Sequence, residues 1–255
     1  MLSYQHGYHA GNLADVHKHA LLAWVLDYLT QKDKPLSYIE THAGRGLYDL
    51  AAPEALKTGE AAAGIARMAP LLPPAHPYLR VLEQMRAAHG ENAYPGSPLI
   101  AEHLLRDTDT IHLAELHPAE HAALSSVSGG RVHRTDGLTL AQSLLPPTPR
   151  RGLLLIDPSY EVKDDYATMA KALPHLHGKW NVGILMLWYP LLPDGRHRPM
   201  ARAITDAIPG TLRHEVGFAP ARPGHGMQGS GMVVVNPPWG MAAQAAMLDR
   251  LFKRL

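Results

Sequence analysis

Short apolar runs alternate with amphipathic segments along most of this chain. The most apolar run, residues 152–156, has no polar residue on either face, which is typical of a parallel strand buried on both sides. Similar runs indicate further strands, and the full set covers residues 36–40, 110–116, 132–135, 152–156, 182–188, 212–218 and 232–235. Segments with apolar residues three and four positions apart indicate helices at residues 20–29, 99–105, 118–124, after 137 up to 145, 165–176, 200–208 and 241–255.

This alternation predicts an α/β fold with a doubly wound, mostly parallel sheet, because intervening helices carry the chain back over the sheet. The last two strands follow each other without a helix, which predicts one antiparallel edge. Residues 52–92 break the rhythm with Ala, Leu and Pro at helical spacing, and we expect a small helical insert there. We therefore interpret residues 1–255 as a single domain with this insert.

Composition narrows the class of protein. Hydrophobic residues make up 46% and charged residues 18%, a balance that supports a full globular core. The chain has no cysteine, which excludes disulfides, thiolate zinc sites and a cysteine nucleophile, and fits the cytoplasmic location that we expect. No apolar run approaches membrane-spanning length, so we predict no membrane association. We also expect a monomer.

The charge is distributed unevenly. Residues 195–255 contain eight Lys or Arg and three Asp or Glu, a net charge of +5, which leaves −4 for the rest of a chain whose total is +1. A local basic face of this kind suits contacts with phosphates, although solvated helix surfaces give the same pattern. The small total charge argues against a general nucleic-acid coat.

The segment Asp157-Pro158-Ser159-Tyr160 directly follows the buried strand, at the edge where open α/β sheets bind their ligands. It resembles the Asp/Asn-Pro-Pro-Tyr/Phe signature of amino-group methyltransferases that use S-adenosylmethionine. An exocyclic adenine amine is a poor nucleophile because its lone pair is delocalised into the ring. The Asp157 carboxylate and the Pro158 carbonyl would accept its two hydrogens and favour a pyramidal nitrogen, while Tyr160 would stack on the flipped base.

Other strand ends carry residues that suit a cofactor. Glu115 could accept from ribose hydroxyls, Asp136 could accept from the adenine amine of the cofactor, and Gly137 would allow backbone access. Each acidic residue alone also suits a helix N-cap. The Gly44-Arg45-Gly46 loop lets a backbone approach a ligand, but Asp49 stands where the dinucleotide fingerprint has its third glycine, which disfavours a nicotinamide enzyme.

Histidines near the start of the chain raise the question of zinc. His6 and His9 precede the first predicted helix, and His17 and His19 lie two positions apart, which on a helix directs them to different faces. No carboxylate–histidine helix motif accompanies them. We therefore predict no metal site. Further along, Ser97 is the expected N-cap of a helix with Pro98 in its first turn.

Many short segments together resemble one family, the bacterial 23S ribosomal RNA adenine-N6 methyltransferases known as RlmJ. The matching segments, in chain order, are Leu2-Ser3-Tyr4, His9-Ala10-Gly11-Asn12, Lys18-His19, Thr41-His42-Ala43-Gly44, Tyr94-Pro95-Gly96-Ser97-Pro98-Leu99-Ile100-Ala101, Glu115-Leu116-His117-Pro118, Asp136-Gly137, Arg150-Arg151-Gly152, Ile156-Asp157-Pro158, Leu187-Trp188-Tyr189-Pro190, Ser230-Gly231-Met232 and Asn236-Pro237-Pro238-Trp239. The order of so many segments makes the resemblance specific. The chain departs from the family pattern at Leu13, His17 and Ser159.

The resemblance implies a class I, Rossmann-like methyltransferase that converts S-adenosylmethionine to S-adenosylhomocysteine and methylates the N6 amine of an adenine in 23S ribosomal RNA. The cofactor contacts that it implies fall on His19, His42, Ser97, Glu115, Asp136, Gly137 and Asp157. The resemblance also makes Asp157 the acceptor for the amine and Tyr160 the stacking residue. It implies RNA handling by the N-terminal residues Tyr4, His6 and Lys18.

Two alternatives stay open at this point. The same tetrad permits an adenine-N6 methyltransferase that acts on DNA, although the chain lacks an obvious sequence-reading module. A non-catalytic RNA-binding assembly protein could also have kept the fold. Methylation assays on RNA and DNA and a cofactor-binding measurement separate these possibilities.

Overall fold

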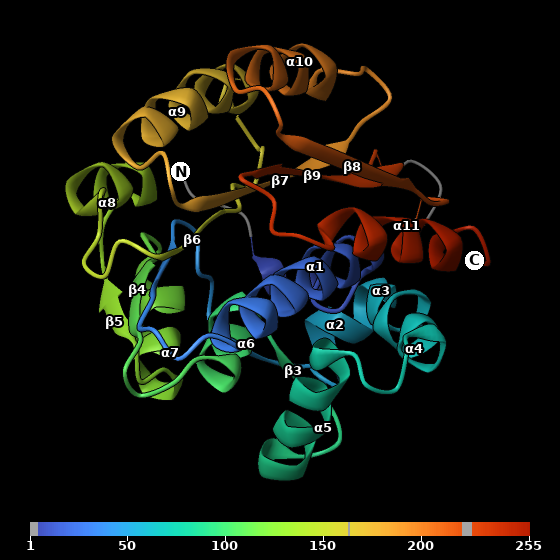
Figure 1. Ribbon diagram of the computed structural model, residues 1–255. Helices are drawn as coiled ribbons and strands as arrows, with labels where there is room; N and C mark the ends of the chain where they lie inside the picture. The colour runs from blue at the N-terminus through green and yellow to red at the C-terminus, as the bar shows by residue number, and fades with distance from the viewer. Residues whose placement is uncertain (1–4, 163, 221–225) are drawn as a thin grey trace.

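The computed structural model describes residues 5–162, 164–220 and 226–255. A seven-stranded sheet runs through its centre in the order β5-β4-β1-β6-β7-β9-β8 (Figure 1). Its strands are β1 (Ser37–Glu40), β4 (Thr110–Ala114), β5 (Arg131–His133), β6 (Gly152–Ile156), β7 (Ile184–Leu191), β8 (Leu212–Gly217) and β9 (Gly229–Val235). The first five strands in that order are parallel, and β9 pairs antiparallel with both β7 and β8. The predicted doubly wound sheet with an antiparallel edge is confirmed.

Helices cover both faces of this sheet and create two separate apolar clusters (Figure 1). One face carries α1 (Leu13–Thr30), α6 (Ser97–Leu104), α7 (Pro118–Val127) and α11 (Met241–Phe252). The other face carries α8 (Gly137–Leu144), α9 (Asp165–Lys179) and α10 (His197–Ala207). Among the helices in the described part of the chain, none is long and apolar enough to cross a membrane.

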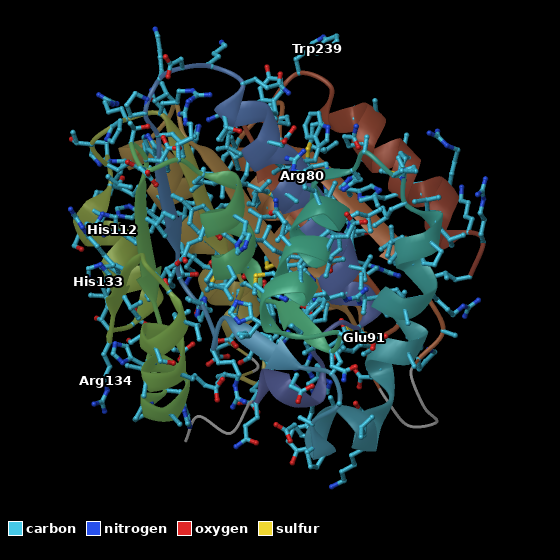
Figure 2. The ribbon with its side chains drawn as sticks, turned by 90° about the horizontal axis from the view of Figure 1, so that it is seen from below. Arg80, Glu91, His112, His133, Arg134 and Trp239 are labelled. Atoms are coloured by element: carbon cyan, nitrogen blue, oxygen red, sulfur yellow. The ribbon has the colours of Figure 1, made fainter. Side chains whose placement is uncertain are left out.

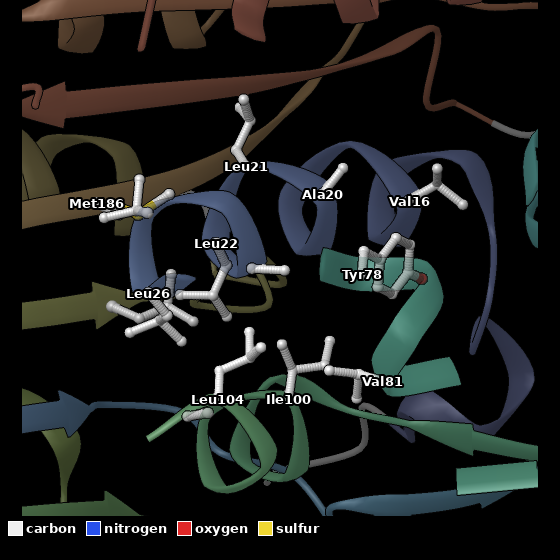
Figure 3. Close-up of a cluster of buried hydrophobic side chains, with 14 of the residues drawn as sticks. Val16, Ala20, Leu21, Leu22, Leu26, Tyr78, Val81, Ile100, Leu104 and Met186 are labelled. Carbon is white, nitrogen blue, oxygen red and sulfur yellow. The ribbon is translucent and has the colours of Figure 1, made fainter. Parts of the chain in front are cut away.

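Helix α1 is the centre of the larger cluster. Its residues Leu22 and Leu26 are fully buried and lie in the close-up beside Ile100, Leu104 and Met186, which come from α6 and β7 (Figure 3). Truncating such a leucine to alanine typically costs about 2–5 kcal/mol of stability. The helix contacts α5, α6, α11 and β9, so it is covered from several sides.

The helical insert is enclosed by two short strands, β2 (Leu47–Asp49) and β3 (Ala93–Pro95), which pair antiparallel. Between them lie α2 (Pro53–Thr58), α3 (Glu60–Ala63), α4 (Ile65–Met68), the 3-10 helix η2 (Ala69–Leu71) and α5 (Pro77–His89). These helices lie within residues 52–92, and their interpretation as an insert in a single domain stays a prediction. The two strands were not predicted, since three residues are too few to show a strand period.

Two predicted helix starts differ from the structure. Helix α1 begins at Leu13, seven residues before the predicted start, because the Asn12 side chain accepts a hydrogen bond from the Asp15 N–H at 2.8 Å. The polar side chains that follow are buried, so they hid the helical pattern. Ser97 is not an N-cap: that position belongs to Gly96, and the Ser97 hydroxyl instead donates to Glu40 Oε1 at 2.5 Å. The Ser97 hydroxyl therefore binds the buried Glu40 carboxyl group and does not cap the helix.

Candidate active site

A cavity of about 360 Å³ opens at the carboxyl ends of the parallel strands, a size that suits a small ligand. Nine of the predicted site residues line it, and these are His6, Lys18, His19, His42, Ser97, Glu115, Asp157, Pro158 and Tyr160. Asp136 and Gly137 are not among the lining residues. The prediction for Tyr4 lies outside the described residues. Topology explains the gathering, because β1 and β6 are neighbours at the switch point of the sheet: the next strand of the sheet after β1 is β4 on one side, and the next after β6 is β7 on the other.

Asp157 leaves the end of β6 and meets Lys18 of α1. The Lys18 Nζ atom lies 2.6 Å from Asp157 Oδ2 and 3.1 Å from Asp15 Oδ1. Burial opposes the charge on Lys18, but the two carboxylates more than offset it and hold the pKa of Lys18 above its ordinary value. Among the described residues, Oδ1 of Asp157 has no hydrogen-bond partner. One carboxylate oxygen is thus held by an ammonium group and the other is left for a ligand.

Asp15 anchors this charged group and was not among the predicted site residues. Its Oδ2 atom accepts from the Gly11 N–H and lies 2.9 Å from His6 Nε2. Burial by itself would raise the pKa of Asp15, but His6, Lys18 and His19 hold it well below its ordinary value. The only local signal is its spacing to Lys18, three residues along one helical face. Asp15 therefore ties the N-terminal segment to the charged cluster of Asp15, Lys18 and Asp157.

Glu115 joins the loops after β4 and β1. Its two oxygens accept from the Gly44 N–H at 2.9 Å and from the His117 N–H at 2.7 Å. Gly44 has a φ of +64°, and a Cβ there would lie 2.6 Å from the Tyr48 hydroxyl, so only glycine fits. Each carboxylate oxygen keeps lone-pair capacity for a further donor such as a ligand hydroxyl.

Glu40 is a buried carboxyl that sequence reasoning missed. It ends β1 and accepts from the Tyr38 hydroxyl at 2.7 Å and from the Ser97 hydroxyl. Burial raises the pKa of Glu40 to about 8, well above its ordinary range. Its position at the end of the first strand, like that of Glu115 at the second, was the available signal. Glu40 fixes Ser97, which itself lines the cavity.

Two histidines in the cavity wall are neutral near pH 7. Burial lowers the pKa of His19 to about 3 and also lowers the pKa of His42. His19 Nδ1 lies 2.9 Å from the Tyr94 hydroxyl, while its buried Nε2 has no hydrogen-bond partner among the residues that the structure describes. Buried polar atoms are rarely left unpaired. The His19 Nε2 atom therefore fits a bound ligand that brings its own polar group.

Two aromatic rings form another wall of the cavity. Tyr160 has a φ of 54°, unusual for a residue with a side chain, and its hydroxyl donates to the Trp188 carbonyl at 2.9 Å. The Tyr160 ring packs against Tyr166 with 4.4 Å between centroids. Trp188 meets Tyr160 edge to face and lies 5.9 Å from Lys18 Nζ. Sequence reasoning had assigned no function to Trp188.

Asp136 and Gly137 have structural roles in this state. Asp136 is the N-cap of α8 and accepts from both the N–H and the hydroxyl of Thr139. A Cβ on Gly137 would lie 1.9 Å from the Thr41 carbonyl oxygen, so glycine is required where α8 packs on the loop after β1. Cofactor contacts at these two positions remain predictions.

The histidines that the structure describes do not converge on a metal site. In the three described stretches, no group of three or more His, Asp or Glu side chains is placed to hold a metal ion. His17 and His19 point to different partners, His214 and Tyr94, as their spacing predicts. His112 and His133 form a stacked pair on β4 and β5 (Figure 2), with their ring nitrogens 3.1 Å apart.

Comparison with known proteins identifies the family of this chain. The family model described as "Ribosomal RNA large subunit methyltransferase D, RlmJ" matches residues 33–255. The chain belongs to the RlmJ family. A relative from Escherichia coli (strain K12), named "Ribosomal RNA large subunit methyltransferase J", is 40% identical over 96% of this chain and 90% of its own length. One of the same name from Haemophilus influenzae is 38% identical, again over 96% of this chain and 90% of its own.

The RlmJ fold is also seen in a solved structure. A crystal structure of a protein from Legionella pneumophila is similar to this chain with a TM-score of 0.87 and 36% identity. The match covers 95% of this chain and 92% of that one. The family resemblance that the short segments indicated is thus confirmed over nearly the whole chain.

Proposed function

We propose that this member of the RlmJ family transfers a methyl group from S-adenosylmethionine to the N6 amine of an adenine in 23S ribosomal RNA. Its curated relatives are named as large-subunit ribosomal RNA methyltransferases, which supports the reaction and the substrate. The observation that carries the chemistry is the Asp157 carboxylate in the cavity wall beside Pro158: Lys18 holds one oxygen, and the other has no partner in the described part of the chain.

The cavity residues fit S-adenosylmethionine by their chemistry. The unpaired Nε2 of His19, the Glu115 carboxylate and the glycine loop after β1 offer partners for polar groups and space for a close approach. We assign cofactor contacts to His19, His42, Ser97, Glu115 and Asp157, and with them Asp136 and Gly137 from the neighbouring loop. The bound cofactor supplies an electrophilic methyl group on a sulfonium centre.

The protein prepares the amine for attack. Asp157 Oδ1 and the Pro158 carbonyl accept hydrogen bonds from the two N6 hydrogens, which localises the lone pair on the nitrogen and directs it toward the methyl donor. The N–C bond would form as the C–S bond of the sulfonium breaks, so that S-adenosylhomocysteine leaves and one N6 proton is released to solvent. Lys18 fixes the carboxylate through Oδ2, so Asp157 does not have to reorient when the base enters. Tyr160 stacks on the adenine from its place in the cavity wall. We also assign RNA contacts to Tyr4, His6 and Lys18. The cytoplasmic location and the monomeric state remain predictions.

Methylation of isolated 23S ribosomal RNA from a strain that lacks the gene tests this function. With radiolabelled cofactor, the wild-type protein is expected to place one N6-methyladenine, which mass spectrometry then maps. Asp157→Ala should abolish the signal, while Asp206→Ala, which removes an exposed carboxylate on α10, should not. Normal activity of Asp157→Ala overturns the mechanism. Methylation of duplex DNA instead supports a DNA enzyme, and calorimetry without cofactor binding supports a non-catalytic RNA-binding protein.

A further inference from the structure

A continuous chain of hydrogen bonds runs from the cavity to the protein surface behind Trp188. The Trp188 Nε1–H donates to Ser230 Oγ at 2.9 Å, and Ser230 Oγ lies 2.8 Å from His17 Nδ1. His17 Nε2 lies 2.9 Å from His214 Nδ1, and His214 Nε2 lies 3.1 Å from Asp249 Oδ1. Ser230, His17, His214 and Asp249 form what we call the relay, and they come from β9, α1, β8 and α11.

With one proton on each imidazole, the carboxylate end sets the direction of every bond in this chain, because an ionised carboxylate can only accept. His214 then donates from Nε2 to Asp249, His17 donates from Nε2 to His214, and Ser230 donates to His17 while it accepts the Trp188 N–H. Burial, and after it His214, lowers the pKa of His17 well below its ordinary value, which favours the neutral form of the His17 imidazole.

The relay is buried where it meets the tryptophan and half-exposed only at its far end. Ser230 and His17 are fully buried, His214 is 6% exposed, and the Asp249 side chain is 44% exposed. A buried polar chain in which every group is paired fixes one arrangement, since any rotation leaves a polar atom without a partner. An apolar side chain in place of Ser230 would fill the space but would not hold the indole N–H.

Trp188 itself faces the reacting groups. Its ring lines the cavity beside Asp157, Pro158 and Tyr160, and Lys18 lies over the ring. From this geometry we infer that the Trp188 indole is a wall against which the target adenine packs, and that the relay is a positioning device which sets the plane of that ring. The inference rests on the proposed function, because it assigns the substrate of the same site.

A double-mutant cycle on purified full-length protein tests the inference. Ser230→Ala is expected to lower kcat/KM for 23S ribosomal RNA about tenfold and to leave the KM for S-adenosylmethionine unchanged. In a Trp188→Phe background the same change should alter kcat/KM less than twofold, because phenylalanine has no N–H for the relay to hold. Equal losses in both backgrounds overturn the inference.

Ser37→Ala is the matched control. Ser37 is also a fully buried serine with two hydroxyl hydrogen bonds, to Pro149 and from Thr110, but it lies at the amino end of β1, away from the cavity at the carboxyl ends of the strands. Ser37→Ala should leave kcat/KM for 23S ribosomal RNA and the KM for S-adenosylmethionine unchanged.

Should Ser230→Ala fail to fold, Asp249→Ala cuts the relay at its half-exposed end. We then expect Asp249→Ala to lower kcat/KM for 23S ribosomal RNA two- to threefold in the wild-type background and to have no effect in the Trp188→Phe background. An equal loss in both backgrounds again overturns the inference.

Fluorine NMR on protein labelled with 5-fluorotryptophan provides a readout independent of activity. The Trp188 signal, assigned by its absence in Trp188→Phe, is expected to shift or broaden in Ser230→Ala and to stay unchanged in Ser37→Ala. An unchanged Trp188 signal in Ser230→Ala overturns the positioning role. If the wild-type protein methylates no RNA, the proposed function fails, and this spectrum still decides whether the relay sets the ring.

Discussion

Two neighbouring residues of α1 lead to polar networks of opposite character. Lys18 joins the charged cluster with Asp15 and Asp157, whereas His17 joins the relay, whose buried part consists of hydroxyl and imidazole groups. The charged cluster borders the cavity, and the relay lies behind one of its walls. One helical turn thus supplies both a charged group at the cavity and a hydrogen-bonded support behind its wall.

We expect substitutions in the charged cluster to cost more stability than substitutions in the relay. Removing one member of a buried ion pair leaves a charge without compensation and typically costs about 3–5 kcal/mol. Leaving one neutral buried group unpaired costs about 1–3 kcal/mol. Substitutions in and around the cavity test this difference in stability and the proposed methyl transfer.

The largest effect is expected for Asp157→Ala. It removes the acceptor for the amine, so kcat on 23S ribosomal RNA should fall by about 10³-fold, as when a pre-oriented electrostatic group is removed from an active site. Single-turnover methylation measures this loss. A decrease of less than tenfold would contradict the role of Asp157 as an acceptor for the amine.

Lys18→Met comes next and tests the charged cluster through stability. The substitution keeps the length of the side chain but leaves the Asp15 and Asp157 carboxylates without their shared cation, and we expect a loss of about 3–5 kcal/mol in urea unfolding. The double variant Lys18→Met with Asp157→Asn should recover part of that stability, since one negative charge is gone. It should not recover activity. Full stability in the single variant would contradict the charged cluster.

Glu40→Gln should change how stability depends on pH. The pKa of Glu40 is about 8 in the folded protein against an ordinary 4.5, so between these values only the unfolded chain releases the proton. Its contribution to stability is therefore full below about pH 4.5 and is lost as the pH rises to about 8. Unfolding free energies from pH 5 to 8 should fall less steeply in Glu40→Gln, by up to about 1.4 kcal/mol per pH unit. The exposed Glu83→Gln is the control and should keep the wild-type slope.

Asp136→Ala gives the smallest expected change. Loss of the N-cap of α8 should cost about 1 kcal/mol in thermal or urea unfolding, while Asp136→Asn keeps a side-chain acceptor and should stay near wild type. Calorimetry on the same variants measures cofactor affinity separately. Weaker binding in Asp136→Ala would support the predicted contact with the cofactor, and unchanged binding would leave Asp136 only its capping role.

The sequence predicted those features of the fold and the site that depend on local residue patterns. Alternating strands and helices gave the sheet with its antiparallel edge, and polar residues at strand ends gave Glu115 and Asp157. The pairing of Lys18 with Asp157 joins residues 139 positions apart, so no local pattern could reveal it. Glu40 and Ser97 illustrate the same limit, because their contact depends on how α6 docks against the end of β1.

The order of strands in the sheet also bears on biosynthesis. Strand β9 follows β8 in the chain but lies between β7 and β8. A nascent chain that has emerged only as far as β8 therefore has no neighbour for that strand, and Ser230 is not yet present behind Trp188. The cavity wall around Trp188 can therefore reach the arrangement described here only after β9 has emerged from the ribosomal tunnel, when synthesis of the chain is nearly finished.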